Sequence, residues 1–214
     1  MARATRLDRD RVVATALRLL DEAGLEGVTL RKVAQALDVK APALYWHFAN
    51  KQALLDEMAT AMFRAMREEP LPDTGDWREG LAEVHRRLRR ALLKHRDGAK
   101  VFSGTRLTDT DHAAWMEEQL GRLVAAGFDP HAAARAAFIV YSFTEGFVIE
   151  EQGVHPMPGE RTPGFDTAER ARRMGPEYPL TTATGDDLFD GYEERFEEGL
   201  RAVITGVAAT LGPA

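Results

Sequence analysis

The segment that decides the fold runs from residue 29 to residue 48 and reads TLRKVAQALDVKAPALYWHF. Its apolar residues recur at spacings that let two short helices bury a shared face. These residues are Val33, Leu37, Val39, Leu44 and Phe48, with small Ala34 where the helices would cross. Thr29 suits the N-cap of the first helix, and Pro42 suits the start of the second. The pattern predicts a helix-turn-helix, although the turn Asp38-Val39-Lys40 lacks the glycine often found there.

A helix-turn-helix presents its second helix to the major groove of DNA. Here the second helix carries Tyr45, Trp46 and His47 in a row, and Asn50-Lys51 follows at once. An ordinary helical hairpin is the alternative, because short helices with apolar patterns are common. The residues of the second helix favour DNA binding over that alternative.

These residues also carry a resemblance. The run from Leu30 to Leu55, with LYWH followed by NK and an ALL helix, resembles the N-terminal domain of the tetracycline repressor (TetR) family. The run from Arg89 to Arg106, RRALLKHRDGAKVFSGTR, is similar to the core of that family's ligand domain, and Phe143–Gln152 is a weaker match. The resemblance covers most of residues 5–152, whereas the C-terminal third matches only in pattern.

Length and composition fit a regulator with two parts. The chain has 214 residues, enough for a small domain and a larger one, and we expect a DNA-binding domain over 1–51 and a ligand-binding and dimerisation domain over 52–214. It has no cysteine, which excludes disulfides and thiolate metal sites. No apolar run approaches the roughly 18 residues of a membrane span, and no signal-peptide pattern is present. These features predict a soluble, cytoplasmic protein that does not bind membranes.

The charge is distributed unevenly along the chain. The net charge is −6, which by itself disfavours nucleic acid. Residues 1–51, however, carry nine Lys/Arg and six Asp/Glu, a net +3, and the remainder is net −9. A basic head on an acidic body is typical of a protein that binds DNA at one end, because neutralising phosphates supplies much of the affinity.

No stretch is typical of a strand, so the sequence predicts an all-α fold, with a three-helix head and a larger helical body. Beyond the helix-turn-helix, helices are expected over 8–23, from Asn50 to about 70, and over 76–95, 112–126, 130–151 and 187–211. Residues 153–187 contain five prolines and several glycines, which predicts a loop with one short helix near Thr167–Arg173.

Two body helices are apolar over wide arcs, around Ala132–Ile149 and Phe189–Val207. Such helices could meet their symmetry mates in a four-helix interface, and a homodimer would bring two helix-turn-helix units to two half-sites of a palindromic operator. A single buried core within one subunit is the alternative.

Ten residues are expected to contact DNA: Thr29, Arg31, Lys40, Ala41, Pro42, Ala43, Tyr45, Trp46, His47 and Lys51. The guanidinium of Arg31 could reach guanine O6 and N7, while Ala41 and Ala43 offer only methyl contacts, for instance to thymine. Thr29, His47 and Lys51 would contact phosphates, and Trp46 would lie half in the core and half toward a phosphate.

The resemblance also implies a set of ligand residues. In tetracycline-binding members of the family, a histidine holds the drug-bound magnesium at the position that Phe102 fills here. The drug-contact positions that have changed their chemistry correspond to Arg67, Val84 and Leu88, and those retained correspond to Thr105, Gln119 and Glu150. Phenylalanine cannot coordinate magnesium. We therefore expect a pocket for a flat or polycyclic organic molecule other than magnesium-tetracycline, unless Phe102 simply fills the site.

The expected function is a ligand-responsive transcriptional regulator without a cofactor or a resident metal. Repression is the mode that we expect, with activation as the alternative. Ligand binding in the body would act through the fourth helix on the spacing of the two recognition helices. One rival is a DNA-binding regulator without a small-molecule switch, controlled by a protein partner. The other is an enzyme, but the histidines show no zinc-binding spacing and no nucleophile or phosphate-loop motif is present, so no catalytic residues are expected.

Overall fold

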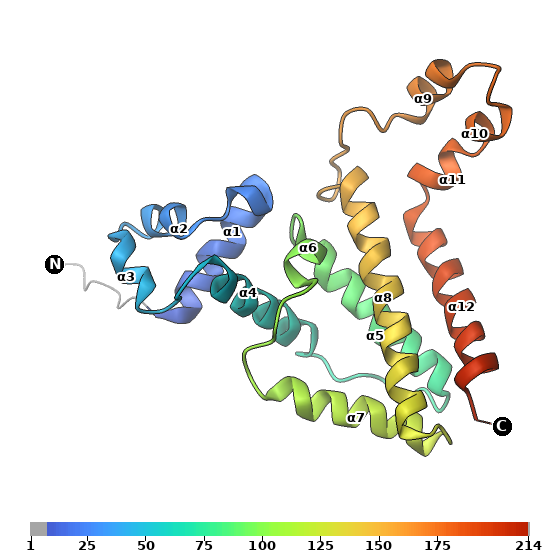
Figure 1. Cartoon of the computed structure of the whole chain (residues 1–214), viewed down its shortest axis with the longest axis horizontal. Coiled ribbons are helices and arrows are strands. Elements are labelled where there is room, and N and C mark those ends of the chain that lie inside the picture. The colour runs from blue at the N-terminus through green and yellow to red at the C-terminus, as the bar shows by residue number, and fades with distance from the viewer. Residues whose placement is uncertain (1–7, 214) are drawn as a thin grey trace. The chain divides into compact units, whose positions relative to one another are not determined.

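The structure is a computed structural model that describes residues 8–213, and every regular element within that range is a helix (Figure 1). The first helices are α1 (Arg9–Gly27), α2 (Leu30–Ala36), α3 (Ala41–Tyr45), α4 (Lys51–Met66), α5 (Trp77–Leu93) and α6 (Gly98–Phe102). The others are α7 (Asp111–Ala125), α8 (Pro130–Val154), α9 (Thr167–Met174), α10 (Pro179–Ala183), α11 (Gly185–Phe189) and α12 (Tyr192–Leu211). The predicted all-α fold is confirmed.

The chain divides into two compact units. The first contains the described residues up to Glu69 together with 91–112, and the second contains residues 70–90 and 113–213. Helix α4 belongs to the first unit, where it packs on both α1 and α6. The predicted boundary after residue 51 concerns where DNA binding ends and stays a prediction.

The first unit has its core between α1, α2, α3 and α4. Val33, Leu44 and Phe48 are buried there as the spacing predicted, and Val101 of α6 joins them. Polar side chains cap the N-termini of α1, α2 and α4. Asp8 accepts from Arg11 N at 2.8 Å, Thr29 from Lys32 N at 3.2 Å, and Asn50 from Ala53 N at 2.9 Å. Sequence-local caps therefore fix where three of the helices start.

The second unit is organised around α8 and α12, which run side by side (Figure 1). Their shared core includes Val140, Leu200 and Ile204. It also holds a cluster of aromatic rings, in which the ring centres of Phe143 and Phe147 lie 5.8 and 5.3 Å from that of Phe196. Asp129 begins α8 as predicted, because its side chain accepts from the backbone N–H groups of residues 131 and 132. By length and composition alone α8 could cross a membrane, but the core helix of a globular domain has the same properties.

Two predictions about the C-terminal region are wrong. The last helix is not continuous over 187–211, because Gly191 adopts a left-handed conformation (φ 63°) and separates α11 from α12. The loop over 153–187 holds α10 in addition to the predicted short helix α9. Pro179 stands in the first turn of α10, where a missing N–H is tolerated, so proline there starts a helix instead of marking a loop.

Candidate nucleic-acid interface and ligand-recognition residues

The helix-turn-helix is built by local signals of α2 and α3. Asp38 adopts the left-handed conformation (φ 54°) that the turn needs, so aspartate replaces the glycine often found there. Lys40 occupies the N-cap of α3, and Pro42 lies in its first turn. Helix α3 is only five residues long, and its single buried side chain, Leu44, holds it against the core.

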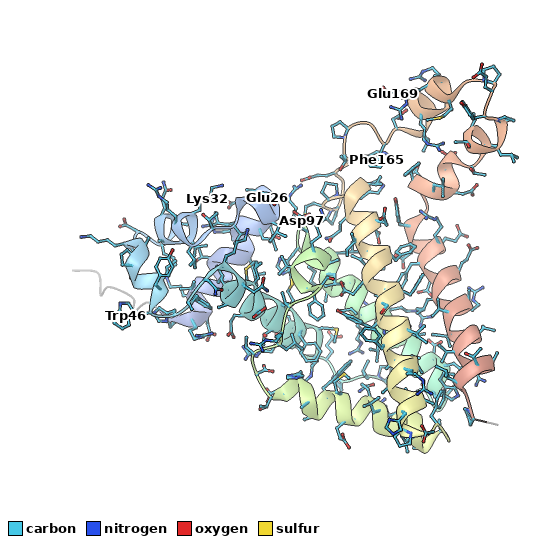
Figure 2. The ribbon with its side chains drawn as sticks, viewed as in Figure 1. Glu26, Lys32, Trp46, Asp97, Phe165 and Glu169 are labelled. Atoms are coloured by element: carbon cyan, nitrogen blue, oxygen red, sulfur yellow. The ribbon has the colours of Figure 1, made fainter. Side chains whose placement is uncertain are left out.

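The other faces of these helices point to solvent. Arg31, Lys40, Pro42 and Tyr45 are exposed, and Thr29, Ala41, Ala43 and His47 are half-buried. Figure 2 shows Lys32 on α2 and Trp46 projecting from the end of α3. Trp46 is 91% exposed, so the prediction that it lies half in the core is wrong. A fully exposed tryptophan beside exposed cations is typical of a surface that contacts a partner.

Arg9 holds the end of the recognition helix, a role that the sequence did not reveal. Its Nη1 donates to the carbonyl oxygen of His47 at 2.8 Å, and its guanidinium lies 4.7 Å from the centre of the Phe48 ring. Its Nη2 donates to Oε2 of Glu57 on α4 at 2.7 Å. The orientation of α3 is thus tied to α4 through one side chain.

Lys51 has a structural partner as well. Its Nζ donates to the carbonyl oxygen of Leu25 at 3.0 Å, near the end of α1. The same part of α1 is held by Asp97, whose Oδ2 accepts from Leu25 N at 2.9 Å (Figure 2). An ammonium has three N–H donors, so Lys51 can still donate to a phosphate with those that the carbonyl oxygen of Leu25 does not use. The predicted phosphate contact of Lys51 stays a prediction.

The segment after α6 is fixed to α4 by polar contacts. Thr108 Oγ1 donates to Glu57 Oε2 at 3.0 Å, and Thr108 N donates to Thr60 Oγ1 at 2.8 Å. Asp109 accepts from Nε of Arg64 at 2.7 Å, and this ion pair lowers the pKa of Asp109, against the effect of burial. Oε2 of Glu57 therefore accepts from two residues distant in sequence, Arg9 of α1 and Thr108 beyond α6.

The residues expected to bind ligand are divided between the two units. In the first unit, Phe102 is partly buried against the core, Thr105 donates its hydroxyl to the carbonyl oxygen of Phe102 at 2.7 Å, and Arg67 lies over the ring of Phe63. In the second unit, Val84 and Leu88 are buried, and Nε2 of Gln119 is buried without a hydrogen-bond partner in the described part of the chain.

The carboxylates of α8 differ in their surroundings. Glu150, the predicted ligand residue, is exposed. Glu151 is buried and accepts two hydrogen bonds of 2.8 Å from Arg89, a residue of α5 that also contacts Glu193. Glu145 is buried, and within residues 8–213 neither of its carboxylate oxygens has a hydrogen-bond partner. The sequence around Glu145 does not indicate that this carboxylate is buried without a hydrogen-bond partner.

Comparisons with known proteins agree with this arrangement. Residues 12–58 match the profile described as bacterial regulatory proteins, tetR family, and residues 69–211 match the tetracyclin repressor-like C-terminal domain. The chain belongs to the TetR family. As a TetR-family member, it is a transcriptional regulator with a helix-turn-helix DNA-binding domain and a tetracycline-repressor-like C-terminal domain.

Individual relatives cover nearly the whole length. The class A tetracycline repressor from transposon 1721 of Escherichia coli is 41% identical over 207 residues, covering 95% of this chain and 92% of the repressor. The crystal structure of a possible TetR family regulator from Streptomyces coelicolor A3(2) is 42% identical, with a TM-score of 0.81 and coverage of 94% and 99%. The Streptomyces coelicolor protein ActR, in complex with actinorhodin, is 27% identical, with a TM-score of 0.79 and coverage of 96% and 98%.

Proposed function

We propose that this TetR-family chain is a dimeric repressor that binds a palindromic operator and is released by a small organic ligand other than magnesium-tetracycline. The observation that carries the proposal is the surface of the helix-turn-helix formed by α2 and α3, which exposes Arg31, Lys40, Tyr45 and Trp46. Arg31 reads a guanine, and Ala41 and Ala43 contact methyl groups. Thr29, His47 and Lys51 position the duplex through phosphates, and Pro42, Tyr45 and Trp46 cover the remaining surface.

The ligand differs from that of the tetracycline repressors to which the chain is similar. Phe102 offers a phenyl ring where the resemblance implies a magnesium-binding histidine, and a ring carbon cannot replace an imidazole nitrogen. Among the positions that the resemblance relates to drug contacts, Thr105 and Gln119 keep hydrogen-bonding groups, whereas Val84 and Leu88 are apolar. ActR, in complex with actinorhodin, is a protein of similar fold that binds another organic molecule. A polycyclic ligand of natural-product size fits this combination.

Ligand binding is transmitted to the DNA-binding surface through α4. Glu57 joins Thr108, just beyond α6, to Arg9, which holds the end of α3. A ligand that prefers a different position of the segment after α6 would disturb these contacts and so reorient the recognition helix. The ligand acts only to the extent that it prefers the state that does not bind DNA.

The dimer forms through exposed faces of α8 and α12. Helix α8 exposes Ile139 and Gly146, and α12 exposes Ala202 and Gly206. A second copy covers these apolar and small residues, and this accounts for the apolar character of α8 without a membrane. The protein acts in the cytoplasm as a regulator, and we assign it no catalytic role.

Selection of duplexes from a random library by the full chain, followed by footprinting, tests the DNA-binding part. We expect a palindromic site occupied by a dimer in sedimentation velocity. Magnesium-tetracycline should then fail to release that duplex in a fluorescence anisotropy titration. Absence of any selected sequence would overturn the operator proposal, and tight magnesium-dependent release would overturn the argument from Phe102.

A further inference from the structure

Glu145 is the unusual carboxylate of the second unit. The residue is only 5% exposed, and neither oxygen has a hydrogen-bond partner in residues 8–213. Burial of a charged group without a partner is costly, and burial raises the pKa of Glu145 to about 8. The isolated subunit therefore holds this group in a state that a cation would stabilise.

Other carboxylates of the same unit show how such groups are normally accommodated. Glu151, further along α8, accepts two hydrogen bonds from the guanidinium of Arg89. Glu197 of α12 likewise accepts from Nε and Nη2 of Arg86, at 2.7 and 2.9 Å. The fold supplies a guanidinium to each of these carboxylates, whereas the described residues supply none to Glu145.

Two aromatic residues share a helix face with Glu145. Phe138, Tyr141 and Glu145 are spaced by three and four residues, which places them on one side of α8. The rings of Phe138 and Tyr141 lie 5.9 Å apart with an interplanar angle of 34°. The pKa of Tyr141 is raised, mainly by burial and also by the charge of Glu145, so the phenol lies within electrostatic range of that carboxylate.

This face differs from the one that packs on α12. Phe143 and Phe147 contact Phe196 of α12, and they lie on the other side of α8 from Tyr141. Phe138 is 66% exposed, Tyr141 is half-buried and Glu145 is buried. The face thus changes along the helix from an accessible aromatic ring to a buried anion.

We propose that Phe138, Tyr141 and Glu145 form a recognition site for the protonated amine of an aromatic ligand. The aromatic rings attract a cation through their faces and stack on the flat part of the ligand, and the carboxylate pairs with the ammonium group. If Glu145 is protonated before binding, its proton leaves to solvent as the ion pair forms. This inference rests on the proposed function, because it names the chemical class of that regulator's ligand.

A matched pair of probes tests the site on the full chain without DNA. 9-(Aminomethyl)anthracene and 9-(hydroxymethyl)anthracene differ in the ammonium group and share the ring system. Isothermal titration should show the amine binding at least about tenfold more tightly than the alcohol, in line with a buried charge-assisted contact. Glu145→Gln, which keeps the shape of the side chain, should remove this preference, so that the variant binds the amine and the alcohol with similar affinity.

Two control variants distinguish this site from a general attraction of cations to an acidic protein. Glu117→Gln removes an exposed carboxylate of α7 and should keep the preference for the amine. Phe138→Ala should weaken both probes without changing the sedimentation coefficient. Equal binding of the two probes by the wild type, binding of neither, or a preference that survives Glu145→Gln would overturn the proposal, as would loss of the dimer in Glu145→Gln. Failure of duplex selection would instead contradict the proposed function alone, because these titrations contain no DNA.

Discussion

Two buried glutamates, Glu57 in the first unit and Glu145 in the second, have opposite surroundings. Glu57 pairs with Arg9 at 2.7 Å and Arg64 at 3.6 Å, and it accepts from Thr108 at 3.0 Å. Glu145 has no hydrogen-bond partner in the described part of the chain. A buried carboxylate with several partners ties elements together, whereas one without partners is costly and is retained where something else can bind it. Under the proposed function, the pairs of Glu57 would transmit a change within the first unit, and Glu145 would receive a ligand in the second.

The largest expected effect comes from turning a paired carboxylate into an unpaired one. Arg89→Ala removes the guanidinium that holds Glu151, so Glu151 would become buried without compensation, as Glu145 is. We expect the free energy of unfolding to fall by about 3–5 kcal/mol in urea denaturation. Arg122→Ala, which breaks an exposed pair with Glu118, should change it by less than about 1 kcal/mol. Equal effects of the two variants would show that burial of the Arg89–Glu151 pair does not increase its contribution to the free energy of unfolding.

The second prediction concerns the pH dependence of stability. The pKa of Glu145 is raised to about 8 from an ordinary value of 4.5, so between these values the folded state binds more protons than the unfolded state. Glu145 therefore makes the free energy of unfolding fall as the pH rises through this window, by at most about 1.4 kcal/mol per pH unit. Glu145→Gln should lack this contribution and should gain stability over the wild type as the pH approaches 8.

Glu57→Gln provides the contrast for that measurement. It weakens the pairs with Arg9 and Arg64, so at neutral pH it should lose stability where Glu145→Gln gains it. Thermal denaturation of both variants over a pH series from about 5 to about 8 checks the two signs. A loss of stability in Glu145→Gln at the alkaline end of the series would mean that Glu145 has a cationic partner in the native protein.

The third prediction concerns the DNA-binding surface, whose side chains are expected to contact the operator instead of other residues of the chain. Arg31→Ala should weaken specific operator binding by about 1–3 kcal/mol and relax the preference at one base pair per half-site, because a bidentate contact to guanine would be lost. Competition binding with duplexes that vary at each position measures both effects. Uniform weakening across all duplexes would reassign Arg31 to a phosphate.

The first unit was largely predictable from sequence because its signals are local. Thr29, Asn50 and the apolar spacing of Val33, Leu44 and Phe48 determine helix starts and core positions within a few residues of each other. The exposure of Trp46 was misjudged because α3 ends at Tyr45 and the chain turns there. Trp46 is also two residues from each of Leu44 and Phe48, which are buried, and residues two apart do not share a helix face, so helical geometry directs it away from the core.

The second unit was less predictable because its polar contacts join residues distant in sequence. Arg89 meets Glu151, and Arg86 meets Glu197, across helices whose pairing no local pattern reveals. Glu145 was overlooked beside Glu150 because acidic residues in an apolar helix look alike in sequence. Only the packed structure shows that Glu150 is exposed and Glu145 is buried.

The smallest expected effect is that of Lys51, which lies in the well-paired first unit and is also a candidate DNA contact. Its ammonium donates to the carbonyl oxygen of Leu25, so only its remaining N–H groups can reach a phosphate. Lys51→Ala should weaken binding to all duplexes alike and reduce the slope of log affinity against log salt by at most about one unit. Lys51→Met, which keeps the apolar stem, should give the same slope if the loss is one of charge. Fluorescence anisotropy over a salt series, with the free energy of unfolding measured beside it, separates the two roles. An unchanged slope together with reduced stability would assign Lys51 to the α1 junction alone, and the phosphate contact predicted from sequence would then be wrong.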